Sequence, residues 1–260
     1  MLIDVHCHLT DEQFNELGVA EVVKRAKSNG VERMITSGCC LESSILSAKI
    51  SDEHENVYCC VGFHPDEVHK YKDGDLERLE ELCSHEKCVA VGEIGLDYHY
   101  DNGPEPALQR KMFIEQLRLA DKVGLPVILH SRDAAGETFE ILDEHKELLK
   151  KGGVMHCYSY SPEMMERFLK LGLHFSFGGP STFKNAKKVQ ECVRRIPVTR
   201  LLSETDCPYL TPEPFRGVFP NEPKNVKYVV EHMATLRNEN TEELENQILS
   251  NAKNLFFKLK

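Results

Sequence analysis

The chain lacks any segment that would cross a membrane. No apolar run in the sequence approaches the roughly 18 residues that a membrane helix needs. Met1 leads directly into a short apolar stretch, without the charged region and apolar core of a secretory signal. We therefore expect a protein without membrane segments, located inside the cell in the nucleus, the cytoplasm or both.

The chain also lacks a CxxC pair, although it has ten cysteines. Several of them, such as Cys59, Cys60, Cys88 and Cys157, lie in apolar stretches with the character of strands. In an intracellular chain such cysteines are expected to be reduced and to act as small buried residues. The sequence therefore predicts no disulfide framework.

An excess of positive charge is missing as well, because the formal net charge is −10. This charge argues against tight, general binding of nucleic acid through a broad basic surface. It is compatible with a small local site for a phosphodiester, because bound divalent metal ions add positive charge where the substrate lies. If DNA is the substrate, we expect its binding to be weak and local. The sequence indicates no membrane and no obligate protein partner.

No linker, internal repeat or low-complexity stretch divides the sequence, and apolar stretches alternate with segments of helical spacing. The expected strands lie at 2–8, 31–38, 57–65, 88–97, 126–132, 153–159, 173–179 and 200–208. Eight strands alternating with about eight helices predict a single α/β domain over residues 1–260, a (β/α)8 TIM barrel. An open doubly wound sheet is the alternative.

The expected helices carry apolar residues every three or four positions. They include 21–30, 76–86, 107–124, 162–172, 185–196 and 241–259. Gly30 is a typical C-cap for the first of them, and Thr241 is the expected N-cap of the last. Glu242 and Glu243 place negative charge in its first turn, where the helix dipole favours it.

The first strand ends in His-Cys-His. Because side chains alternate along a strand, His6 and His8 point to one side and Cys7 to the other. Two imidazoles on one face can share a metal ion. The alternative is that two polar residues merely cap the strand.

Other strands end in polar residues too. The ends of the predicted strands carry His64, Glu93, His130, His156, Glu204 and Asp206. The carboxyl ends of all barrel strands meet at one mouth, where barrel enzymes have their active sites. Each residue alone has a structural explanation, as a turn residue or a satisfied core histidine. A cluster of buried polar groups is costly without a shared partner, so together they predict a metal centre.

The ligand set suits two metal ions. His6, His8 and Asp206 can hold the first, and His130 and His156 the second. Glu93 can bridge them with its two oxygens. Two ions about 3.5–4 Å apart can hold a hydroxide between them and clamp a scissile phosphate. The histidine-rich set favours zinc or manganese over magnesium.

Seven motifs along the chain resemble those of the TatD-related deoxyribonucleases. They are DVHCHL, GFHP, GEIGLDY, LHSRDA, MHCYS, ETDCPYL and PFRG…NEP, which follow one another in this order between Ile3 and about Asn225. The resemblance implies a metal-dependent DNase on a barrel of the amidohydrolase type, with an animal member of the family as the expected nearest relative. It implies 3′-exonuclease activity, with abasic-site cleavage as a further activity, and magnesium, manganese or zinc as the metal.

The resemblance also implies roles for individual residues. By it, the metal ligands are His6, His8, Glu93, His130, His156 and Asp206. His64 would lie beside the site as a polar contact, and Glu204 would hold an additional or alternative metal.

The proton acceptor of the reaction is expected at Asp206, because one of its oxygens can bind metal while the other accepts a hydrogen bond from water. A metal-bound histidine is a poor base, since its second nitrogen is usually held by another group. Glu204 and His64 are the rival bases.

Substrate contacts are expected from Arg132 and Arg216, which can bind phosphate oxygens in pairs. Arg216 can instead anchor its own loop through a salt bridge. Tyr98 is a candidate for stacking on a base, although loop packing is the more common role of such a residue. The basic segment 184–200 is interpreted as the exposed face of an outer helix, except for Lys184 near the top of the barrel.

Two other functions use the same ligands. One is hydrolysis of amide or cyclic C–N bonds, as in the wider amidohydrolase group, and the other is a metal-binding scaffold without activity. The loop that carries Arg216 and the GEIGLD and ETDCP motifs favour hydrolysis of DNA.

Overall fold

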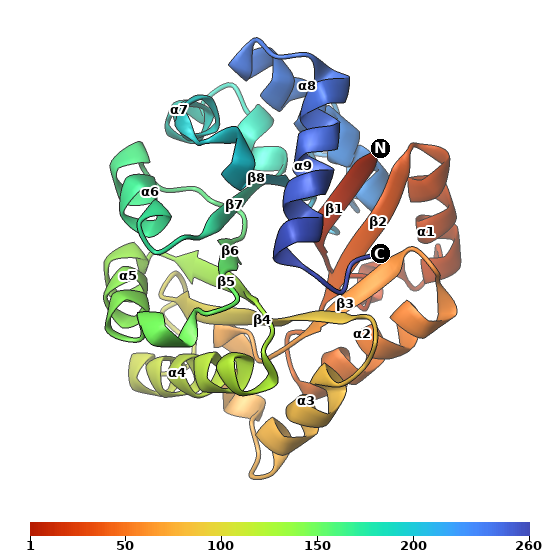
Figure 1. Cartoon of the computed structure of the whole chain (residues 1–260). Helices are drawn as coiled ribbons and strands as arrows, with labels where there is room; N and C mark the ends of the chain where they lie inside the picture. The colour runs from red at the N-terminus through yellow and green to blue at the C-terminus, as the bar shows by residue number, and fades with distance from the viewer.

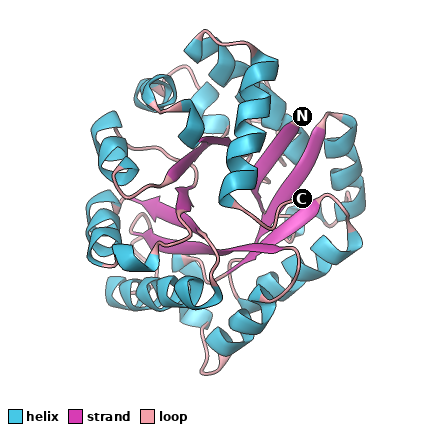
Figure 2. Ribbon diagram, in the orientation of Figure 1, coloured by secondary structure: helices cyan, strands magenta, loops and turns pink.

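The computed structural model describes residues 1–260, and its eight parallel strands form a barrel inside a ring of helices (Figures 1 and 2). The strands are Leu2–Cys7 (β1), Val31–Ser37 (β2), Val57–Val61 (β3), Cys88–Asp97 (β4), Val127–Arg132 (β5), Gly153–Met155 (β6), His174–Phe177 (β7) and Leu201–Ser203 (β8). Each strand pairs with the next one in the chain. The predicted (β/α)8 barrel is confirmed, and the open doubly wound sheet is wrong.

Nine α-helices cover the outside of the barrel (Figure 2). They are Val19–Ser28 (α1), Leu41–Glu53 (α2), Asp75–Cys83 (α3), Pro106–Val123 (α4), Ala135–Glu144 (α5), Pro162–Leu169 (α6), Lys187–Arg195 (α7), Val226–Arg237 (α8) and Thr241–Leu255 (α9). Short 3₁₀ helices lie at Glu12–Phe14 (η1), Pro65–Lys70 (η2), Lys146–Leu148 (η3), Gly179–Thr182 (η4), Val198–Arg200 (η5) and Pro223–Asn225 (η6). None of these helices is both long and apolar enough to span a bilayer.

The barrel closes where β1 meets the end of β8. The His8 N–H donates to the carbonyl of Cys207 at 2.8 Å, and the Asp206 N–H donates to the carbonyl of His6 at 2.9 Å. The Ser203 hydroxyl donates to the Ile3 carbonyl. Helices α8 and α9 pack over this junction (Figure 1). The closure brings the first and last predicted metal ligands side by side, although they lie 200 residues apart in the chain.

One hydrophobic core of 69 buried residues fills the barrel and the layer beneath the helices. At Gly95, strands β4 and β5 approach so closely that a Cβ would lie 1.9 Å from the His130 carbonyl oxygen. Only glycine fits there, and it also adopts a φ of 149°. This close approach fixes the polar residues of β4 beside His130.

Several expected boundaries change. Strands β6 and β8 are three residues each, shorter than predicted, and after β6 the backbone turns at Cys157 with a φ of 44°. The N-cap of α9 is Asn240, not Thr241, because the extended backbone at Asn240 lets its side chain accept the Glu243 N–H at 3.1 Å.

The basic segment 184–200 forms α7 and its flanks, with Val189, Val193 and Ile196 buried. Its interpretation as the outer face of a helix is confirmed. Lys184 lies before the helix and is exposed. All ten cysteines are free, as expected. Of the four that were expected to be buried, Cys59, Cys60 and Cys88 are buried, and Cys157 is partly exposed.

Candidate metal centre

The structure gathers all six predicted ligands at the mouth formed by the carboxyl ends of the strands. Two of them, His6 and His130, lie within the last residues of β1 and β5, and Glu93 lies in β4. The others follow the strand ends: His8, His156 and Asp206.

Glu93 occupies the centre of this cluster and is almost fully buried. Its Oε1 lies 2.7 Å from His130 Nδ1 and 2.7 Å from His156 Nε2. Its Oε2 lies 3.1 Å from His6 Nε2 and 3.6 Å from His8 Nε2. The two oxygens of one carboxylate therefore face two different pairs of imidazoles, as a bridging ligand requires.

The first half of the cluster has the dimensions of a metal site. The Nε2 atoms of His6 and His8 are 3.2 Å apart, and they lie 3.6 and 3.3 Å from Asp206 Oδ1. With Glu93 Oε2 as the fourth atom, five of the six distances between these ligand atoms lie between 3.1 and 3.6 Å. A tetrahedron of ligand atoms about 2.1 Å from a zinc ion has edges of about 3.4 Å. The donor set and its spacing therefore fit a divalent metal ion.

Both histidines of this half are oriented by a second contact. His6 Nδ1 lies 3.1 Å from the Ser37 hydroxyl, and His8 Nδ1 lies 3.5 Å from Cys39 Sγ. The Nε2 atoms are left for the cluster. Histidine ligands are commonly fixed in this way, through the nitrogen that does not face the metal.

The second half of the cluster consists of Glu93 Oε1, His130 Nδ1 and His156 Nε2, and the two ring nitrogens are 3.1 Å apart. Asp97 contacts the opposite side of the His130 ring, with Oδ2 2.9 Å from His130 Nε2. Asp97 is therefore a positioning residue for His130. Sequence reasoning missed it, although it lies four residues after Glu93 and thus on the same side of the strand.

The charges in the cluster suit metal ligands. Burial lowers the pKa of His6 to about 4, so its ring is neutral near pH 7. Burial alone would raise the pKa of Glu93, but the neighbouring His156, His6 and His64 hold it well below its usual range. Burial alone would also lower the pKa of His8, His130 and His156, but the acidic groups beside these rings raise it instead. A metal ion would therefore displace protons from these three imidazoles when it binds.

His64 lies at the edge of the cluster, with Nε2 3.5 Å from Glu93 Oε1. Its Nδ1 accepts the N–H of Asp66 at 3.1 Å. In the neutral ring, Nε2 therefore carries the proton and points it toward the mouth. Burial and the neighbouring His130 lower the pKa of His64 to about 3, which keeps the ring neutral. This arrangement makes His64 a hydrogen-bond donor at the mouth, while its ring also belongs to a group with Asp97 and His130 whose ligand atoms lie within 4.8 Å of one another.

Glu204 is fully buried beneath the mouth. Its Oε1 accepts the Cys157 N–H and its Oε2 accepts the Ser176 hydroxyl, both at 2.5 Å. Oε1 also lies 3.8 Å from His156 Nδ1. Burial and the charge of Asp206 raise the pKa of Glu204 to about 7. The structure therefore places Glu204 behind His156, where it holds the backbone turn after β6.

Asp206 adopts a left-handed backbone conformation with a φ of 55°. Aspartate tolerates this region better than most residues that carry a side chain. The backbone contact to the His6 carbonyl holds the turn in place and directs the carboxylate toward His6 and His8.

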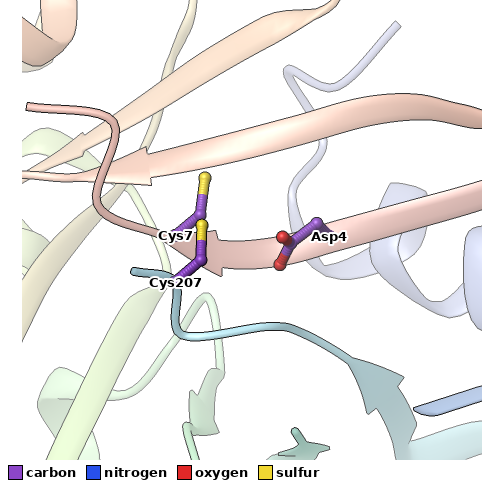
Figure 3. Close-up of side chains that lie close together, drawn as sticks. All are labelled: Asp4, Cys7 and Cys207. Atoms are coloured by element: carbon purple, nitrogen blue, oxygen red, sulfur yellow. The ribbon is translucent and has the colours of Figure 1, made fainter. Parts of the chain in front are cut away.

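A second buried group lies close to the centre: Asp4, Cys7 and Cys207 (Figure 3). Asp4 is already satisfied, because its Oδ2 accepts the Thr205 hydroxyl at 2.5 Å and its Oδ1 accepts the Thr205 N–H at 2.9 Å. Cys7 Sγ donates to the Ile35 carbonyl. This group therefore links β1 to the segment after β8 and keeps the ligands on both in register.

The three predicted substrate contacts have different surroundings. Arg132 is exposed at the end of β5 and donates to the hydroxyl of Tyr100 at 3.2 Å. Tyr98 donates its hydroxyl to Glu137 of α5 at 2.8 Å, which turns it away from the cluster. Arg216 forms no ion pair, so the salt bridge considered for it is absent. Its guanidinium lies 4.0 Å from the centre of the Phe183 ring.

Comparison with known proteins identifies the family. The family model described as TatD related DNase matches residues 3–257. The chain belongs to this family. It is 44% identical over 257 residues to the uncharacterized metal-dependent hydrolase YabD of Bacillus subtilis, covering 98% of this chain and 99% of that protein. It is 36% identical to the uncharacterized metal-dependent hydrolase YcfH of Escherichia coli, covering 98% and 95%.

Solved structures agree. The crystal structure of YJJV, a TatD homologue from Escherichia coli, superposes with a TM-score of 0.92 at 33% identity and 98% coverage of both chains. The structure of a β-aspartyl dipeptidase from Fervidobacterium islandicum superposes with a TM-score of 0.68 at 17% identity, and the match covers 98% of this chain and 74% of the dipeptidase. The two proteins share the fold.

Family and relatives together support the coarser expectation, a metal-dependent hydrolase. These matches do not support an animal member as the nearest relative, or a nuclear location.

Proposed function

We propose that the chain hydrolyses phosphodiester bonds of DNA at a centre of two divalent metal ions. The observation that carries this proposal is the position of Glu93, whose two oxygens face two separate sets of ligands. His6, His8 and Asp206 would hold one ion, and His130 and His156 the other. The family to which the chain belongs supports DNA as the substrate.

Divalent ions at this position would supply Lewis acidity toward a phosphate ester and lower the pKa of water. The residues of the chain supply the rest. Asp206 accepts the proton of the attacking water, and the Nε2–H of His64 donates a hydrogen bond to the substrate at the mouth. Glu204 supports the turn after β6 and is the alternative base or the ligand of a further metal. The histidine-rich donor set favours zinc or manganese, with magnesium as the third candidate.

Arg132 is the phosphate contact that the geometry supports best, because it is exposed beside the His130 half of the centre. Arg216 lies on the loop after β8 with its charge unpaired by any carboxylate. Because the net charge is −10, we expect the protein to bind DNA only through the few basic residues near the site. We assign 3′-exonuclease activity, and abasic-site cleavage as a further activity, to this same centre.

The proposal is tested with fluorescently labelled single-stranded DNA and purified protein. The wild type is expected to cut DNA with added Mn²⁺, Zn²⁺ or Mg²⁺ and to stop in EDTA. Glu93→Gln is expected to be inactive. Glu140→Gln, at an exposed position of α5, is the matched control that should behave as wild type. A contaminating nuclease would cut equally in all preparations.

Two outcomes would overturn the proposal. Cleavage of amide or cyclic C–N substrates together with intact DNA would establish the amidohydrolase alternative. Two bound ions without hydrolysis of either substrate class would establish a metal-binding scaffold.

A further inference from the structure

A hollow of about 520 Å³ opens beside the metal centre. It is lined by Asp66, His69, Tyr100, Asn102, Gly103 and Pro104. These residues belong to η2, which follows β3, and to the loop between β4 and α4. Both segments follow the carboxyl ends of strands, so the hollow opens on the same side of the barrel as the metal ligands.

His64 connects the hollow to the centre. Its Nε2 lies 3.5 Å from Glu93 Oε1, while its Nδ1 accepts the N–H of Asp66 at 3.1 Å. The imidazole ring of His64 therefore lies between the Glu93 carboxylate and Asp66, the first residue of the hollow. The hollow thus adjoins the place where a phosphate at the centre would lie.

Asp66 brings an unused hydrogen-bond acceptor to this place. Its Oδ1 is buried and has no hydrogen-bond partner. A buried carboxylate oxygen without a donor is costly, so the group calls for a partner such as a ligand donor or an ordered water. A Cβ added at Gly103 would lie 3.8 Å from this oxygen, so a side chain there would pack against it, and the glycine keeps that side of the carboxylate free of one. The site is thus prepared for a donor and repels an anion.

Tyr100 supplies an apolar wall. Tyr100 is 51% exposed, although it lies at the rim of a polar mouth. The Arg132 guanidinium lies 5.1 Å from the ring centre and donates to the hydroxyl, and the His99 ring contacts Tyr100 edge-on at 5.0 Å. These contacts fix the ring. They also place a positive charge against the Tyr100 ring, where it could pair with the phosphate of a stacked nucleotide.

We propose that this hollow binds the base of the nucleotide next to the scissile phosphate, with Tyr100 stacking on the base and Asp66 Oδ1 accepting a hydrogen from its exocyclic amino group. The inference rests on the proposed hydrolysis of DNA. Cytosine carries an amino group where thymine carries a carbonyl oxygen, so the carboxylate attracts the first base and repels the second. The site therefore prefers cytosine to thymine.

The test compares labelled oligo(dC) and oligo(dT) in two assays. Cleavage gives kcat/KM, and fluorescence anisotropy with the Glu93→Gln protein gives the affinity for each oligonucleotide. For the wild type we expect kcat/KM to favour oligo(dC) by on the order of 10-fold. Asp66→Asn should remove or invert this ratio, since an amide can donate to the thymine carbonyl. Tyr100→Ala should weaken both substrates, and Tyr100→Phe should restore stacking.

Asp101→Asn is the matched control, because Asp101 is an exposed acid of the same loop that does not line the hollow. It should keep the wild-type ratio. Equal affinity and turnover for the two oligonucleotides, or a ratio that survives Asp66→Asn, would overturn the inference while DNA hydrolysis stands. Selective binding of oligo(dC) that depends on Asp66, without any cleavage, would uphold the base site and remove the proposed function.

Discussion

Replacing Asp97 by asparagine should weaken the second metal site selectively. Asp97 Oδ2 lies 2.9 Å from His130 Nε2, and the opposite nitrogen of the same ring faces Glu93. Burial alone would lower the pKa of His130, but Asp97 and Glu93 raise it to about 9. The negative charge of Asp97 therefore makes the ring a stronger ligand and fixes which nitrogen faces the centre.

The size of the effect follows from the kind of contact. A hydrogen bond to a charged group contributes about 1.5–3 kcal/mol, which corresponds to roughly 12- to 160-fold in an equilibrium constant. Loss of a carboxylate that supports a histidine ligand typically costs about 10- to 100-fold in metal affinity or activity. We expect Asp97→Asn to weaken one of two metal-binding steps by about this factor and to lower kcat in parallel.

Isothermal titration of metal-free protein with Mn²⁺ or Zn²⁺ resolves the two steps, and a thermal melt checks the fold. Asp133→Asn is the matched control. Asp133 forms a similar pair with His99, 2.8 Å between Oδ2 and Nδ1, but both side chains are largely exposed and neither is a predicted ligand. If Asp97→Asn binds both ions as tightly as wild type, or if Asp133→Asn loses as much affinity, the positioning role of Asp97 is wrong.

Four further outcomes are expected. Glu93→Ala should lose metal in elemental analysis, and retention of both ions would exclude the bridge. Asp206→Asn should lower kcat by about 10²- to 10⁴-fold with little change in DNA affinity, and a near wild-type rate would move the base to Glu204 or His64. A salt titration of single-stranded DNA binding should give a slope of about −1.4 to −2.8 in a double-logarithmic plot, for two to four phosphate contacts; a much steeper slope would implicate the basic segment 184–200. Burial lowers the pKa of His174 to about 4 in the folded protein, so the unfolded chain takes up the proton first as the pH falls below 6.5. The free energy of unfolding that His174 contributes above pH 6.5 should therefore be lost as the pH falls toward 4. Urea unfolding should show a loss that is larger by roughly 3 kcal/mol in wild type than in His174→Gln. Parallel plots of unfolding free energy against pH for the two proteins would refute this.

Two simple rules allowed the candidate ligands to be predicted from the sequence. Strand periodicity placed His6 and His8 on one side, and the topology of a parallel barrel placed the ends of all strands at one mouth. Neither rule needs to know side-chain contacts. The six candidate ligands could therefore be assembled from strand order alone, and the structure brings them together.

What surrounds the ligands depends on contacts that strand order does not contain. Asp97 shares a side of its strand with Glu93, but only the register of β4 against β5 shows that it reaches His130. The role of His64 as a donor depends on the N–H of Asp66, a feature of the short helix that follows. Tyr98 and Tyr100 have the same chemistry, and only the structure shows that Tyr98 is hydrogen-bonded to Glu137 whereas Tyr100 contacts Arg132.

Helix α2 escaped the sequence analysis for a different reason. Its buried face contains Ser44, Ser47 and Ser51 beside Leu41 and Ala48, so it has almost no apolar stripe. The face is small because the helix lies close to the chain after β2, where a Cβ at Gly38 would lie 2.3 Å from Ser44 Oγ. Hydrophobic periodicity cannot reveal a helix that is packed through serines.

Hydrolysis of DNA at a centre of two metal ions that Glu93 would bridge is best tested by adding metal in steps to metal-free protein while following cleavage of labelled single-stranded DNA. We expect activity to rise until two equivalents per chain are bound, and Glu93→Gln to stay inactive at every step. Full cleavage by metal-free protein, or intact DNA with both ions bound, would contradict it.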